Sequence, residues 1–164
     1  LVRPDISLEE RLMVCKTLAD LSASSAVNSL KIIRTNGLPE AFSTILSETG
    51  SALGYNKSSS AANRTDERHQ TYIALCISRC SSRTRLNVLG DGIHTEVCLK
   101  LARTEGLVDG LWALKKHPES FVQICSAVAL GSLCQCEEAV GTNRRLMRFK
   151  WNSNALQLPA PPLR

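Results

Sequence analysis

The sequence predicts an all-α protein in which one helical unit is used twice. Residues 30–38 (LKIIRTNGL) return as residues 99–107 (LKLARTEGL), with Lys, Arg, Thr, Gly and two Leu at matching places. Apolar residues recur at helical spacing on both sides of the repeated glycine. Hydrophobic residues make up 43% of the 164 residues and aromatic residues only 4%, which favours closely packed aliphatic helices over an aromatic-rich sandwich. A chain of this length suits one domain with its own core.

The spacing of apolar residues predicts helices over 8–22, 26–36, 39–48, 66–81, 94–105, 107–117 and 119–135. Ser7 is placed as the N-cap of the first of these helices, because two glutamates follow it in the first turn. Gly37 and Gly106 are expected to be left-handed bends, since glycine adopts positive φ without steric cost. Pro39 fits a first helical turn, and Pro118 ends the helix before it.

Two stretches are predicted to lack regular helix. Residues 49–66 contain Gly50, Gly54 and three consecutive serines without a sustained apolar period, which predicts an exposed, mobile insertion. Residues 82–92 are predicted to form a loop, with a turn of helix around 86–89. The helical units are therefore expected to be joined by one long and one shorter connection.

The positive charge of the chain belongs to its C-terminal segment. All 15 acidic residues lie at or before Glu138, as do 15 of the 20 basic residues, so the whole net charge of +5 comes from the residues after that point. Together with the change in composition after Val140, this predicts a helical domain over 1–140 and a basic, Pro-containing tail over 141–164. A misread or alternatively spliced end would produce the same abrupt change.

The basic residues of segment 144–151 are Arg144, Arg145, Arg148 and Lys150, and apolar residues stand between them. As a helix, this segment could bind a nucleic acid or an anionic membrane. The alternative is that it forms part of a further repeat helix, followed by a solvated tail that is extended at its prolines.

The order of short helix, glycine, medium helix and longer helix resembles the armadillo repeat. Gly37 and Gly106 stand where that family has a glycine between its first and second helices. The family's third helix has Val-Gln, a small residue, Ala-Leu, Asn-Leu and Ala at fixed positions. The residues that stand at these positions are Val122-Gln123, Ser126, Ala129-Leu130, Ser132-Leu133 and Cys134. A second set in the same register is His69-Gln70, Ile73, Cys76-Ile77, Arg79-Cys80 and Ser81, and a third, looser set is Val14, Thr17-Leu18, Asp20-Leu21 and Ser22. The resemblance covers about residues 8–135 and implies an α-α superhelix, an armadillo-type solenoid of about two to three repeats with insertions.

The same resemblance implies a non-catalytic scaffold or adaptor that holds an extended or helical segment of a partner protein on the concave face of its third helices. In this register that face carries Lys16, Asp20, Tyr72, Leu75, Arg79, Cys125, Val128 and Ser132. The Trp and Asn ladders of nuclear-import armadillo proteins are absent, which argues against an import receptor. As an alternative, neighbouring repeats or the insertion cover these apolar residues. About three units are a practical minimum, and the chain opens at Leu1 without Met, so a fragment of a longer repeat protein is expected.

No cofactor, metal or catalytic group is expected. Glycine-rich phosphate loops of the common spacings are absent, and the three histidines lie far apart from one another along the chain. The cysteines are seven, an odd number, and most lie on apolar helix faces, which favours free thiols in a reducing compartment. The cytoplasm is the expected location, with the nucleus as the alternative. No apolar run approaches the roughly 20 residues that span a bilayer, so a soluble protein is predicted.

Overall fold

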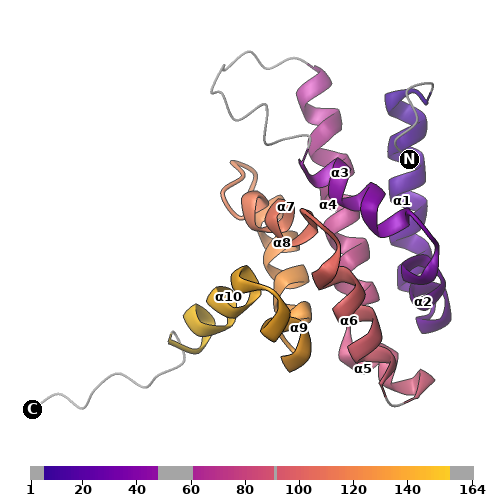
Figure 1. Cartoon of the computed structure of the whole chain (residues 1–164). Coiled ribbons are helices and arrows are strands. Elements are labelled where there is room, and N and C mark those ends of the chain that lie inside the picture. Colours follow the sequence, from indigo (N-terminus) through magenta and orange to yellow (C-terminus); the bar gives the residue numbers. More distant parts are fainter. Residues whose placement is uncertain (1–5, 48–60, 91, 156–164) are drawn as a thin grey trace, which may run out of the picture.

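The computed structural model describes residues 6–47, 61–90 and 92–155 (Figure 1). Within these residues the chain forms ten α-helices and one 3₁₀ turn and no strand, which confirms the all-α prediction. In chain order the elements are α1 (Leu8–Ser24), α2 (Ala26–Arg34), α3 (Leu38–Ser47), α4 (Ala61–Cys80), α5 (Arg83–Leu86), η2 (Asn87–Leu89), α6 (Ile93–Arg103), α7 (Leu107–Leu114), α8 (Ser120–Leu133), α9 (Glu137–Thr142) and α10 (Arg144–Ala155).

The predicted N-cap of α1 is confirmed. The Ser7 hydroxyl accepts a hydrogen bond from the Glu10 backbone N–H at 3.2 Å, and the Glu10 carboxylate accepts one from the Ser7 N–H at 2.9 Å. These reciprocal bonds satisfy two backbone donors that the first turn leaves open. At the other end, α1 continues to Ser24 instead of ending at Ser22. The break falls at Ser25, whose extended backbone and hydroxyl cap α2 by accepting a hydrogen bond from the Asn28 N–H at 3.1 Å.

The start of α4 differs from the sequence prediction. The helix begins at Ala61, so the last residues of the predicted insertion 49–66 are helical. Two alanines open this segment and no Gly or Pro lies between 61 and 66, which explains the longer helix. The rest of the predicted insertion, 49–60, lies outside the described residues.

The repeated nonapeptide has the same backbone structure in both copies. Gly37 and Gly106 have φ of 76° and 74°, as the sequence predicts. Before each glycine, a threonine at the end of the helix donates twice to a lysine carbonyl: Thr35 to Lys31 through N–H (3.0 Å) and hydroxyl (2.8 Å), and Thr104 to Lys100 (3.1 and 2.9 Å). The repeated residues therefore end one helix and turn the chain into the next in the same way twice.

Helices next to one copy of the repeated nonapeptide pack on the corresponding helices next to the other copy. α4 lies between α1 and α8, α3 packs on α7, and α2 contacts α6, which in turn packs on α9. α10 contacts α7, α8 and α9. Figure 1 shows α1 at one end of the molecule and α10 at the other.

The contacts between the copies are specific and close. The Arg34 guanidinium makes two hydrogen bonds of 2.8 Å to the Glu96 carboxylate, which joins α2 to α6 and lowers the pKa of Glu96. The Ser43 hydroxyl donates to the Glu105 carbonyl at 2.5 Å, beside the Gly106 bend. Gly110 is buried against α3, where a Cβ would lie 2.6 Å from the Cβ of Leu46. The core around these contacts is almost entirely aliphatic, with Phe42 as its one fully buried aromatic side chain among the described residues.

Candidate functional site

The residues predicted to bind a partner lie on α1, α4 and α8, the three helices that pack side by side with α4 in the middle. Lys16 and Asp20 are exposed on α1. Tyr72 and Leu75 are partly exposed on α4. Val128 is 52% exposed on α8, and Ser132 is partly exposed one turn later. We call the exposed sides of these helices the α1–α4–α8 face.

Cys125 does not belong to this exposed surface. Its side chain is only 2% exposed, and burial raises the pKa of its thiol. The sequence register places Cys125 and Val128 on one side of α8, but Cys125 is buried, near enough to Arg79 of α4 for that charge to act on the pKa of its thiol, whereas Val128 is exposed. This residue of the predicted set is therefore a packing residue in the structure.

Arg79 lies on the predicted face, but its guanidinium is held by the protein itself. Nη1 donates to the Ala19 carbonyl of α1 at 2.6 Å. Arg85 makes a similar bond of 2.9 Å to the Ala23 carbonyl near the end of the same helix. Both arginines tie the end of α4 and the following turn to α1, so replacing Arg79 would disturb helix packing as well as the surface.

Sequence reasoning missed two apolar residues beside the predicted face. Phe121 and Ile124 are 58% and 57% exposed on α8, and with Val128 they form a row at spacings of three and four residues. Monomeric soluble proteins seldom leave several large apolar side chains exposed together, and such patches often mark protein contacts. The available signal was that α8 is apolar around most of its circumference, which is more than one buried face requires.

The basic segment 144–151 is a packed helix in the structure. α9 crosses the predicted domain boundary at Val140, and Leu146 of α10 is fully buried. Phe149 packs edge-on against Trp112 of α7 with ring centroids 6.3 Å apart, and the Lys115 ammonium lies within 5 Å of both ring centroids, at 4.6 and 4.8 Å.

Two of the four basic side chains in this segment are engaged in ion pairs. Arg145 pairs with Asp109 of α7, and Lys150 pairs with Glu137 of α9. Arg144 and Arg148 are exposed, and neither forms an ion pair with a described residue. The positive charge available to an anionic ligand is therefore smaller than the sequence predicts.

Cys98 and His94 do not form an activated nucleophile. Cys98 Sγ lies 3.3 Å from His94 Nε2, one turn earlier on α6, and both side chains are buried. Burial raises the pKa of the Cys98 thiol to about 12 and lowers the pKa of His94. The pair is accordingly a neutral thiol beside a neutral imidazole at pH 7, whereas a nucleophilic cysteine needs a lowered pKa. Among the described residues, no three His, Cys, Asp or Glu side chains are placed to hold a metal ion.

We expect slow alkylation of the native thiols at neutral pH. All seven cysteines are free, and Cys134, the only one not fully buried, has its pKa raised by burial to about 11. Iodoacetamide should therefore modify Cys134 first, with a rate that rises as the pH approaches 11, and should modify all seven only after unfolding. Mass spectrometry of digests taken over time measures this order. Rapid labelling of Cys98 in the folded chain at pH 7 would contradict the neutral pair.

No family model, curated protein or solved structure matches this chain. None of the helices in the described part of the chain combines the length and apolar composition needed to cross a bilayer. What the chain does is therefore inferred from its own packing and surface chemistry.

Proposed function

We propose that this chain is a non-catalytic scaffold or adaptor of the armadillo type, which binds a segment of a partner protein along the α1–α4–α8 face. The observation that carries the proposal is the exposed row of Phe121, Ile124 and Val128 beside the half-buried Tyr72 and Leu75. Apolar side chains of this size on adjacent helices offer anchor sites for a peptide.

The helix order and packing support the armadillo-type part of the proposal. Each repeated nonapeptide joins a first and a second helix through a left-handed glycine, and a longer third helix follows. α4 stacks on α1 and α8 stacks on α4, the successive packing that is typical of a solenoid. The free, mostly buried cysteines support a reducing compartment, for which we propose the cytoplasm, with the nucleus as the alternative.

The charges of the face favour a peptide over a phosphate backbone. Lys16 and Asp20 bring opposite charges on α1, Arg79 is engaged with the Ala19 carbonyl, and the exposed row of α8 is uncharged. A nucleic acid or an anionic membrane would require a larger set of available basic groups. α10 offers only Arg144 and Arg148 beyond its ion pairs, so this second function has less support.

The test is a binding measurement with matched surface variants. Capture from a cell extract identifies the partner, and calorimetry with the purified partner gives the affinity. The double variant Phe121→Asp with Val128→Asp should weaken binding at least about tenfold, because it places charges where apolar anchors are expected to dock. The control Val88→Asp alters an exposed apolar residue on η2, outside the three helices, and should bind as the unmodified chain does.

Circular dichroism must first show that the variants remain folded. Full affinity in the folded double variant would contradict the proposal. Loss of binding in Arg144→Glu with Arg148→Glu, together with a steep salt dependence, would favour the basic surface of α10 instead.

A further inference from the structure

α4 is covered on two opposite sides by neighbouring helices. Toward α1, His69 Nε2 lies 3.1 Å from the Leu8 carbonyl. Further along α4, Cys76 donates to the Leu18 carbonyl and Arg79 to the carbonyl of the next residue, Ala19. In the helical register the opposite side of α4 carries Gln70, Ala74 and Ser78, which are buried. Because α8 also packs on α4, we assign this side to α8. α4 therefore uses one side to pack on α1, the helix before it in the stack, and the opposite side to pack on α8, the helix after it.

The side of α8 that corresponds to this second side of α4 is uncovered. The three helices are compared in the register that aligns His69-Gln70 of α4 with Val122-Gln123 of α8. In this register, the residues of α8 that correspond to Gln70, Ala74 and Ser78 of α4 are Gln123, Ala127 and Gly131. The corresponding residues of α1 are Arg11, Cys15 and Ala19. Cys15 and Ala19 are buried under α4, whereas Gln123 is exposed and Ala127 and Gly131 are partly exposed. We call Gln123, Ala127 and Gly131 the open side of α8.

α1 is uncovered on the opposite side. Its row Met13, Thr17, Leu21 corresponds to Tyr72, Cys76, Cys80 on α4 and to Cys125, Ala129, Leu133 on α8. The row on α8 is buried against α4, and Cys76 and Cys80 are buried as well. Met13 is 70% exposed and Leu21 43% exposed, so α1 lacks a helix at this position among the described residues. We call Met13, Thr17 and Leu21 the open side of α1.

We propose that copies of this chain associate head to tail, with the open side of α1 of one copy packed on the open side of α8 of the next. α9 packs on α6 in the same way that α6 contacts α2, the first helix of the preceding unit. Likewise, α10 contacts α7 in the same way that α7 packs on α3, the second helix of the preceding unit. The pair α9 and α10 thus has the place of a first and second helix, but no described helix follows it on α8. α1 is a third helix with no such pair before it among the described residues.

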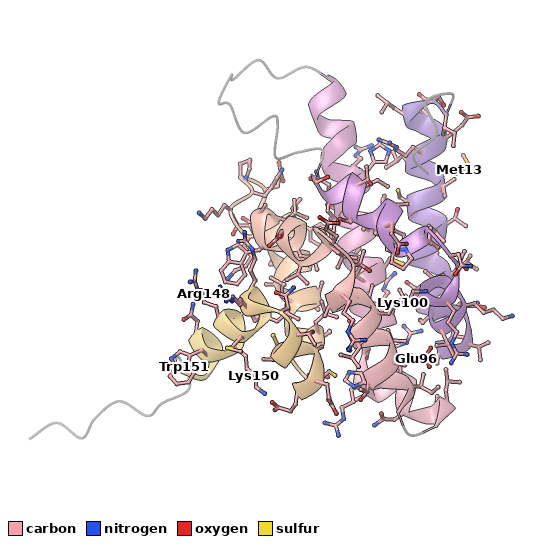
Figure 2. All side chains as sticks on the ribbon, viewed as in Figure 1. Met13, Glu96, Lys100, Arg148, Lys150 and Trp151 are labelled. Atoms are coloured by element: carbon pink, nitrogen blue, oxygen red, sulfur yellow. The ribbon has the colours of Figure 1, made fainter. Side chains whose placement is uncertain are left out.

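The open side of α8 in one copy therefore lacks a following third helix, and α1 of the next copy is such a helix. Their association would repeat the packing of α4 on α1 and of α8 on α4 within the chain. The two open sides belong to the outer helices of the three-helix stack, because α4 packs between α1 and α8; Figure 2 shows Met13, on the open side of α1, at one edge of the molecule. An interface between two different surfaces does not close on itself in a dimer and permits longer assemblies. The proposal depends on the helix packing and goes beyond the binding of a partner segment by the α1–α4–α8 face.

The test uses variants that block one end each. Leu21→Arg blocks α1, Ala127→Arg blocks α8, and Val88→Arg on η2 is the matched control. Sedimentation velocity and light scattering measure the mass of the particles in solution. For the unmodified chain at micromolar concentrations, this mass should rise with concentration and exceed that of a dimer. Each blocked variant alone should stay monomeric, and an equimolar mixture of the two should form dimers and nothing larger, since each variant keeps one open side. Val88→Arg should assemble as the unmodified chain does.

Thermal melts by circular dichroism establish that each variant is folded, and Met13→Arg, at a more exposed residue of the same side, replaces Leu21→Arg if that variant unfolds. An unmodified chain that stays monomeric across the concentration range would overturn the proposal. It would equally be overturned by a mixture of folded variants that stays monomeric, or by one blocked variant that still forms dimers alone.

Discussion

Gly110→Val is expected to lower the free energy of unfolding by about 3 kcal/mol, because α7 and α3 pack too closely at this point for a branched side chain. A Cβ at residue 110 would lie 2.6 Å from the Leu46 Cβ and 3.4 Å from the Leu46 carbonyl carbon. Leu46 is fully buried, so neither helix can relieve the clash without moving apart. Thermal unfolding should show a fall in Tm of roughly 10 °C for a loss of this size.

The matched control is another helical glycine with free space around it. Gly141 in α9 has no heavy atom within 4 Å of the position of an added Cβ. Gly141→Ala should leave stability unchanged or raise it by up to about 1 kcal/mol, because alanine favours the helix. A Gly110→Val variant that melts with the unmodified chain would show that α3 and α7 do not pack as the structure describes.

Leu146→Ala is expected to cost about 3 kcal/mol, within the range for removing a fully buried leucine side chain. Leu146 is fully buried where α10 packs on α7, α8 and α9, although the sequence places it in a basic tail. Its neighbour Met147 is 50% exposed, and Met147→Ala should change stability by less than about 0.5 kcal/mol. Urea unfolding of the two variants measures the difference, and equal stabilities would mean that α10 does not dock.

The bends and helices could be predicted from the sequence because their causes are local. Gly37 and Gly106 each follow a helix of regular apolar spacing, and a glycine in that position commonly has positive φ. The Ser7–Glu10 cap likewise depends on residues three positions apart. Physical causes within one or two turns of a helix can be seen directly in the order of the residues.

The parts that could not be predicted depend on contacts between distant segments. The docking of α10 depends on Trp112 and Lys115, more than thirty residues before Phe149, so composition alone left open whether segment 144–151 forms a basic surface helix or a further repeat helix. Cys125 and Val128 share a side of α8 in the helical register, and only the packing of α4 decides that one is buried and the other exposed. Arg79 is charged and was expected on the surface, yet its long side chain reaches the Ala19 carbonyl.

Site-specific photo-crosslinking tests most directly whether the α1–α4–α8 face binds a protein segment, as we propose. A photoreactive benzoylphenylalanine is introduced at Val128 in one preparation and at Val88 in another, both exposed apolar positions. With the captured partner bound, irradiation should cross-link the partner to position 128 and leave position 88 uncoupled. Cross-links formed from position 88 and absent from position 128 would contradict this proposal.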